Sequence, residues 1–300
     1  MASPFVCVLD SKSSLGECPV WSAHERVLYW VDINAPSLNR FDPATGGNVA
    51  MPMPESIGSF ALRAGGGFIV ALRGGIWLAR ADGKLERKIL DAPYDPAHHR
   101  FNDGRCDPQG RFFAGTMNER RDAYSAELLR IDADCAMTRI LADITISNGL
   151  AWSPDGRTMY WADTHAHVVW AFDFEPLGGA MTSRRVFAQF APRPGQGLAG
   201  YGGRPDGAAV DAEGCYWVAM YEGARVLRLS PAGELLAEVH VPARCPTMPC
   251  FGDSDLKTIY VTSASLGRPP EERDQYPHAG CTFAFRVDVP GLPVRLMALA

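Results

Sequence analysis

The chain has 300 residues, of which 47% are hydrophobic and 21% are charged, and its formal net charge is -5 at pH 7. This composition is typical of a globular protein with a sizeable core, and the mild negative charge without a Lys/Arg-rich run argues against a nucleic-acid partner. No apolar run approaches the ~18 residues of a membrane span, and the opening MASPFVCVLD lacks the features of a signal peptide, so we expect a cytoplasmic protein with no membrane partner.

Eight cysteines are scattered along the chain without a Cys-x-x-Cys pair or a zinc-like spacing. In a cytoplasm such thiols are expected to stay reduced. The spacing therefore favours packing roles for these side chains over redox or metal-ligand roles.

Short strand-like segments recur along the chain, most of them preceded by a turn-like cluster such as DPQG, SPDG or DAEG. Their residues alternate with a period of two and show no sustained helical period. The six segments begin at Leu28, Phe68, Phe112, Met159, Cys215 and Ile259, which are roughly 40 to 56 residues apart. Repeats of about 40–50 residues that contain several short strands are typical of a β-propeller.

We therefore predict an all-β protein, with one domain over residues 1–300 that folds as a six-bladed β-propeller around a central channel. The ends of the chain must close the ring, because an incomplete last blade would leave an exposed edge. Three strand-like segments could share that blade: FVCVL (5–9), CTFAFRVDV (281–289) and VRLMAL (294–299). A β-sandwich with coincidental spacing is the alternative.

Polar residues recur at one position of the repeat, four residues before the apolar residue that leads into the turn. In chain order, this position holds Glu17, Gly58, Asn102, Asn148, Asp206 and Thr247. Equivalent positions on the innermost strands of a propeller converge on its axis. Two carboxylates and two amides brought together there need a positive partner, and their oxygen atoms suit a divalent cation. The alternative is a polar channel that holds water.

Longer motifs resemble the senescence marker protein (regucalcin)/gluconolactonase family, in the family's order, over most of the chain. They are LGECPVW, RFNDGRCDPQGRFFAGTM, ISNGLAWS, RPDGAAVDAEGCYWVAMYEGARVLRLSPAG, and CFGD followed by IYVTSA. The resemblance implies a six-bladed propeller with one divalent metal ion in the channel and, in many members, hydrolysis of aldonolactones. It also implies metal ligands at Glu17, Asn148 and Asp206, and substrate-binding residues at Arg100 and Asn102.

Two loops depart from the family. The segment NERRDAYSAELLR after GTM is shorter than in the animal members, and APRPGQGLAGYGGR ahead of Asp206 is long and rich in glycine. Both are expected to shape the mouth of the channel. The sequence GQGLAG in the second loop matches G-x-G-x-x-G, but no βαβ unit surrounds it, so we expect a rim loop and not a dinucleotide site.

The predicted function is metal-dependent hydrolysis of a sugar aldonolactone, a pentono- or hexonolactone, to the aldonic acid. The cofactor would be one divalent ion (Ca²⁺, Mn²⁺, Zn²⁺, Mg²⁺ or Fe²⁺), and Asp206 is the candidate general base for the attacking water. The partner would be the small-molecule lactone, and the protein a monomer or a weak homo-oligomer. The alternatives are a calcium-binding propeller with a regulatory role, and an aryl-ester or phosphotriester hydrolase.

Overall fold

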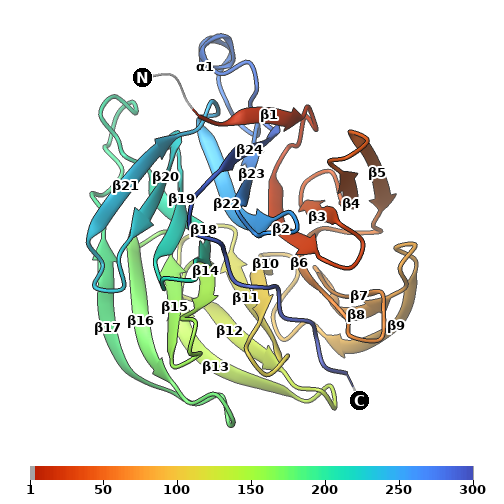
Figure 1. Cartoon of the computed structure of the whole chain (residues 1–300). Coiled ribbons are helices and arrows are strands. Elements are labelled where there is room, and N and C mark those ends of the chain that lie inside the picture. The colour runs from red at the N-terminus through yellow and green to blue at the C-terminus, as the bar shows by residue number, and fades with distance from the viewer. Residues whose placement is uncertain (1–3, 300) are drawn as a thin grey trace.

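The computed structural model describes residues 4–299 as twenty-four strands and one short helix. The strands form six four-stranded antiparallel sheets around a central axis, as Figure 1 shows. The prediction of a six-bladed β-propeller is confirmed. Among the described residues, no helix is long and apolar enough to cross a membrane.

Blades 1 to 5 each consist of four consecutive strands. Blade 1 contains β2 (Gly16–Ser22), β3 (Val27–Asp32), β4 (Ser37–Asp42) and β5 (Gly47–Pro52); blade 2 contains β6 (Ile57–Leu62), β7 (Phe68–Leu72), β8 (Gly75–Ala79) and β9 (Leu85–Asp91). Blade 3 contains β10 (His99–Cys106), β11 (Phe112–Asn118), β12 (Ala126–Ile131) and β13 (Met137–Ile144); blade 4 contains β14 (Ser147–Trp152), β15 (Thr158–Asp163), β16 (Val168–Phe174) and β17 (Met181–Gln189). Blade 5 contains β18 (Arg204–Val210), β19 (Tyr216–Tyr221), β20 (Arg225–Leu229) and β21 (Leu235–His240).

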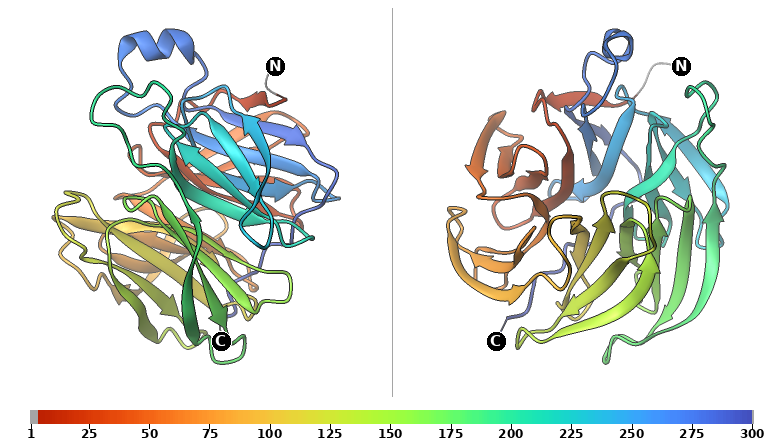
Figure 2. Two further views of the ribbon diagram at one scale, coloured as in Figure 1. Left: turned by 90° about the vertical axis from the view of Figure 1, so that its left-hand side faces the viewer. Right: turned by 180° about the vertical axis from the view of Figure 1, so that it is seen from behind.

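Blade 6 combines both ends of the chain. It contains β22 (Cys245–Gly252), β23 (Thr258–Ala264), β24 (Thr282–Arg286) and β1 (Val6–Leu9). The outermost strand β1 pairs antiparallel with β24, with Val6 opposite Ala284. The helix α1 (Pro270–Gln275) lies in the connection from β23 to β24 and projects from this blade, as Figure 2 shows. The N-terminal strand therefore closes the ring, as the sequence predicted.

The prediction that VRLMAL adds a strand to this blade is wrong. Residues 291–298, which we call the C-terminal segment, instead run from blade 5 to blade 2, where Gly291 bridges Asp211 and Met297 bridges Arg63. Figure 1 shows this segment crossing one face of the ring. The outer edge of β24 is already paired with β1, and Pro293 has no N–H to donate to a ladder.

The C-terminal segment covers one end of the channel. Beneath it lies a cavity of about 90 Å³, which is lined by Leu292 to Arg295 and by residues near the ends of the inner strands, including Phe60, Trp152 and Val210. The amide of Met297 donates to the carbonyl of Leu62 over 2.7 Å. The open mouth of the channel is therefore at the other end, where the inner strands begin.

A break in strand register recurs where the inner strand of each blade meets its neighbour. The breaks lie between Glu17 and Val20, Ile57 and Ser59, Phe101 and Gly104, Asn148 and Ala151, Pro205 and Ala208, and Pro246 and Met248. Bulges of this kind bend a strand and change the direction of a side chain. All six residues at the repeated sequence position lie at or inside these breaks.

The docking of the C-terminal segment can be tested with two adjacent residues. Met297 is fully buried, whereas Leu296 is 43% exposed. We expect Met297→Ala to lower the free energy of unfolding by about 2–5 kcal/mol, because it removes buried volume and leaves a cavity. Leu296→Ala should change it by less than about 1 kcal/mol. Urea unfolding measures both values, and equal losses would show that the segment is not docked as described.

Candidate functional site

Polar side chains from four inner strands gather at the open mouth of the channel. Glu17 on β2, Asn102 on β10, Asn148 on β14 and Asp206 on β18 line one cavity of about 200 Å³, together with Arg100. Each of these five residues is less than one-tenth exposed. The structure thus brings together every site residue that the sequence indicated, although the chemical role of each stays a prediction.

A chain of hydrogen bonds joins three of these side chains. Nδ2 of Asn102 donates to Oδ1 of Asn148 and to the carbonyl of Ser147, both over 2.9 Å. Nδ2 of Asn148 donates to Oδ1 of Asp206 over 2.6 Å and to the hydroxyl of Thr164 over 2.8 Å. Both amide hydrogens of Asn102 are therefore used in positioning its neighbours.

The two carboxylates of the cavity are unfavourable in their ionised form. Burial raises the pKa of Glu17 well above its usual range, and the negative charges of Asp206 and Asp103 raise it further. Burial likewise raises the pKa of Asp206 to about 8, and the nearby Arg204 opposes that rise. A divalent cation between the two carboxylates would allow both to be ionised.

The donor set of Glu17, Asn148 and Asp206 fits a hard or borderline divalent cation. Two carboxylates and one amide oxygen are ligands that such ions prefer, and they leave coordination positions for water and substrate. In the present orientation Asn148 directs Nδ2, not Oδ1, toward Asp206. Cation binding therefore requires the amide oxygen on that side, which a half-turn of the amide group achieves.

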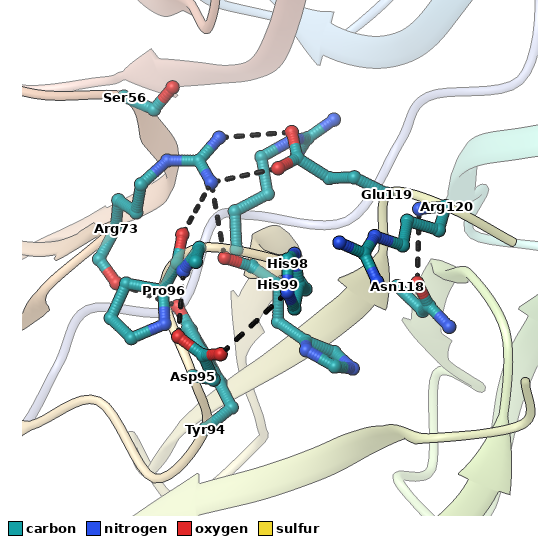
Figure 3. Close-up of polar contacts among 12 residues, drawn as sticks. Ser56, Arg73, Tyr94, Asp95, Pro96, His98, His99, Asn118, Glu119 and Arg120 are labelled. Atoms are coloured by element: carbon teal, nitrogen blue, oxygen red, sulfur yellow. Dashed lines mark hydrogen bonds and ion pairs between the residues drawn. The ribbon is translucent and has the colours of Figure 1, made fainter.

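Arg100 is fixed in the wall of the cavity by its own neighbours. Its Nη1 donates to Oδ1 of Asn102 over 2.6 Å and to the carbonyl of Phe101 over 2.9 Å. Its Nε lies 3.5 Å from Oε1 of Glu119, and Glu119 accepts two hydrogen bonds from Arg73, as Figure 3 shows. Among the described residues, no acceptor is bonded to Nη2 of Arg100, which is free to bind a ligand.

Two further arginines line the cavity, and the sequence analysis did not single them out. Arg204, at the start of β18, has its Nη1 3.4 Å from a carboxylate oxygen of Glu222. Arg121 has no acidic partner among residues 4–299. The signal that could have found it is the Arg-Arg pair in the short NERRDAY loop.

The loop that carries Arg121 is held by Asn118. The side chain of Asn118 donates to Oδ1 of Asp122 over 2.9 Å and to the carbonyl of Ala123 over 3.2 Å. The backbone amide of Arg121 donates to the carbonyl of Asn118 over 3.1 Å, and the φ angle of Arg121 is 58°. The turn therefore fixes the point from which the Arg121 side chain reaches the cavity.

At the two remaining positions of the repeat, Gly58 and Thr247 allow or form contacts with the backbone of a neighbouring blade. A Cβ atom on Gly58 would lie 2.3 Å from the carbonyl oxygen of Phe101, so β6 can approach β10 only if this residue is glycine. The hydroxyl of Thr247 donates to the carbonyl of Gly16 and thereby connects blade 6 to blade 1.

The Gly-rich loop, residues 195–203, lies beside the mouth and contributes no described residue to the cavity wall. The hydroxyl of Tyr201 lies 2.7 Å from Nε2 of His167, and Nη2 of Arg244 donates to the carbonyl of Leu198 over 3.0 Å. These contacts attach the loop to blades 4 and 5.

The chain is similar to known proteins over its whole length. A family described as SMP-30/Gluconolactonase/LRE-like region matches residues 15–265. The chain is 48% identical over 292 residues to a 6-deoxy-6-sulfogluconolactonase of Pseudomonas putida, covering 97% of this chain and 98% of that protein. It is 36% identical over 293 residues to regucalcin of Danio rerio, covering 96% of each chain.

Solved structures agree with the fold. The crystal structure of regucalcin from Agrobacterium tumefaciens, described as a calcium-binding protein, superposes with a TM-score of 0.90 at 26% identity and covers 99% of each chain. A gluconolactonase from Xanthomonas campestris superposes with a TM-score of 0.72 at 21% identity, covering 96% of this chain and 89% of that one. The second likeness concerns the fold alone.

The raised pKa of Asp206 predicts that Asp206→Asn makes the metal-free protein more stable. The pKa of Asp206 in the fold, about 8, lies above the value of about 3.9 for an unfolded aspartate. Ionisation therefore destabilises the metal-free fold increasingly as pH rises between these values. In chelator the variant should melt a few degrees higher than the parent at pH 8, by a smaller margin at pH 5, and at nearly the same temperature at about pH 4, by differential scanning fluorimetry.

Adding Ca²⁺ or Mn²⁺ should reverse the order, because only the parent retains both carboxylates for the ion. Asp134→Asn, which changes an exposed carboxylate between β12 and β13, is the matched control and should respond to pH and metal as the parent does. Equal metal responses of the parent and Asp206→Asn would contradict the assignment of Asp206 as a ligand.

Proposed function

Because the chain belongs to the SMP-30/gluconolactonase/LRE-like family, we propose that it is a lactonase that hydrolyses a sugar aldonolactone to its aldonic acid. The observation that carries the proposal is the polar cavity at the open mouth, where the buried carboxylates of Glu17 and Asp206 share a wall with the free donor of Arg100. The substrate would come from an enzyme that oxidises an aldose at its anomeric carbon.

Glu17, Asn148 and Asp206 would hold one divalent ion in this cavity. Such an ion, when bound, polarises the lactone carbonyl and stabilises the negative charge that develops on its oxygen. The description of Agrobacterium tumefaciens regucalcin as calcium-binding supports Ca²⁺; Mn²⁺, Zn²⁺, Mg²⁺ and Fe²⁺ suit the same oxygen donors.

Asp206 accepts the proton of the attacking water in this proposal. In the metal-free structure its Oδ1 accepts a hydrogen bond from Asn148 over 2.6 Å. Once Asn148 turns its amide oxygen toward the ion, Oδ1 of Asp206 would bind the ion as well, which leaves Oδ2 for the water. The hydroxyl of Thr164 accepts from Asn148 and donates to the carbonyl of Pro205 over 2.7 Å. The burial of the Asp206 carboxylate strengthens it as a base.

Arg100 binds an oxygen of the sugar through Nη2. Its Nη1 is engaged with Asn102 and Phe101, so the guanidinium cannot turn away from the cavity. In the metal-free structure both amide hydrogens of Asn102 are donated, to Asn148 and Ser147, and the one donated to Asn148 is released when Asn148 turns its amide oxygen toward the ion. A remaining lone pair of its oxygen is available to a sugar hydroxyl.

We further propose that the lactone carries an anionic group at the end distant from its carbonyl. Arg121 lines the cavity without an acidic partner among the described residues, and an arginine fork is well suited to a sulfonate, phosphate or carboxylate. The Pseudomonas putida relative, named for a sulfonated gluconolactone, supports this class.

Asp206→Asn is expected to reduce kcat for aldonolactone hydrolysis by roughly 10²-fold or more, because it removes the proton acceptor and retains the shape of the side chain. Initial rates on a panel of 1,4- and 1,5-lactones, followed with a pH indicator and with metal present, measure the change. Asp134→Asn should keep the parent rate. Faster turnover of phenyl acetate than of every sugar lactone would refute the sugar-lactonase proposal and support an aryl esterase.

Arg121→Ala should raise KM for an anionic aldonolactone by roughly 10-fold or more, because hydrogen bonds to charged groups contribute about 1.5–3 kcal/mol. Its KM for neutral gluconolactone should stay within about twofold of the parent value. Arg120→Ala is the control: this neighbour is exposed, as Arg121 is, but it lies beside Asn118 in Figure 3 and does not line the cavity. A similar loss on both substrates would rule out recognition of the anionic group by Arg121.

A further inference from the structure

A second group of metal-binding side chains lies at the outer edge of blade 6, where the N-terminal strand β1 meets the segment before β24. Cys7 on β1, and His278 and Cys281 between α1 and β24, each present one ligand atom within 4.8 Å of the other two. Cys281 is buried, Cys7 is half-buried and His278 is exposed. Figure 1 shows β1 crossing beside β24, below α1.

Packing explains only part of this arrangement. Cys7 and Cys281 border an apolar cluster between blades 5 and 6, which accounts for their burial. It does not account for the imidazole of His278, or for the carboxylate of Asp10, whose Oδ1 lies 3.3 Å from Sγ of Cys281. Three side chains with affinity for metals converge here from segments more than 260 residues apart.

We propose that Cys7, His278 and Cys281 bind one Zn²⁺ ion, distinct from the ion of the channel. Two thiolates and one imidazole are typical zinc ligands, and they bind at about 2.3 Å and about 2.0–2.1 Å in tetrahedral geometry. Those bond lengths place the ligand atoms about 3.5–3.8 Å from one another, so the observed group needs only a small contraction. A water molecule or the carboxylate of Asp10, which accepts a hydrogen bond from Cys281, would fill the fourth position.

Zinc binding at this site requires no change of oxidation state. Two S–H bonds break, two Zn–S bonds form, and two protons pass to solvent, one of them by way of Asp10, which accepts the hydrogen bond of Cys281. Burial, with Cys7 and Asp10 nearby, raises the pKa of the Cys281 thiol, so the thiol stays protonated until a cation compensates the charge. No oxidant is needed, and both thiols are free in the structure.

Zinc bound at this site would stabilise the closure of the ring. Cys7 belongs to the N-terminal strand β1, and Cys281 immediately precedes β24, with which β1 pairs. An ion held by both would bind the folded state only, and its binding free energy would add to the stability of that pairing.

Cobalt spectroscopy tests the proposal independently of the channel. The protein is first saturated with Ca²⁺ and then given one equivalent of Co²⁺ per chain. We expect a thiolate-to-cobalt charge-transfer band and intense visible bands of tetrahedral Co²⁺, which an all-oxygen site does not produce. Zn²⁺ should abolish these bands stoichiometrically.

The variants are Cys281→Ser, His278→Ala and, as the matched control, Cys135→Ser, which changes a half-buried thiol between β12 and β13. His278→Ala changes an exposed residue and should leave the fold intact while weakening Zn²⁺ binding by at least about 10-fold. Cys281→Ser should lose the charge-transfer intensity of its thiolate, and Cys135→Ser should match the parent. In the Asp206→Asn background, elemental analysis should still find one zinc per chain.

Two results would overturn the proposal. One is a parent protein without the thiolate band, or with a band that His278→Ala leaves unchanged. The other is a Cys7–Cys281 disulfide, detected by peptide mass spectrometry without reductant, in protein that takes up no zinc. Loss of activity in Asp206→Asn together with retained zinc would separate the two metal sites, whereas failure of the lactonase assay alone would leave the zinc result standing.

Discussion

The pairing of β1 with β24 is the contact on which the rest of the structure depends. Five blades are built from consecutive strands, and the sixth is complete only when the two ends of the chain meet. Glu17 lies in the first blade and Asp206 in the fifth, so the separation of these carboxylates is set by the blade between them. Opening of this pairing would separate Cys7 from Cys281 at the proposed zinc site and leave blade 6 without its outermost strand.

Within the closed ring, the site results from a balance between backbone geometry and charge. The bulge at the start of each inner strand directs one side chain to the axis. At Glu17 and Asp206 the residue so directed is a carboxylate, and the burial of two such groups without a counter-ion costs several kcal/mol. The metal-free form would therefore be less stable, because the same two buried carboxylates that form a strong cation site lack a counter-ion in it.

Local patterns predicted the fold and four of the channel residues, Glu17, Asn102, Asn148 and Asp206, whereas Arg100 was predicted from the family resemblance. The period of the strands indicates a propeller, and the recurrence of a polar residue at one position of the repeat indicates which side chains meet. The same alternation failed for VRLMAL, because a strand-like sequence does not show whether a sheet edge is available to it. Arg121 was missed because its place depends on a turn held by Asn118, and Cys7 because ring closure, not spacing, brings it to His278 and Cys281.

The C-terminal segment covers one end of the channel and leaves the other end open. Residues 291–298 cross the far end, so the open mouth beside Arg121 would serve a ligand both for entry and for exit. Product would have to depart before the next substrate arrives, and product still in place would compete with substrate for the enzyme. If the lactone carries the proposed anionic group, its acid product would have to dissociate past the same arginines that bind the substrate.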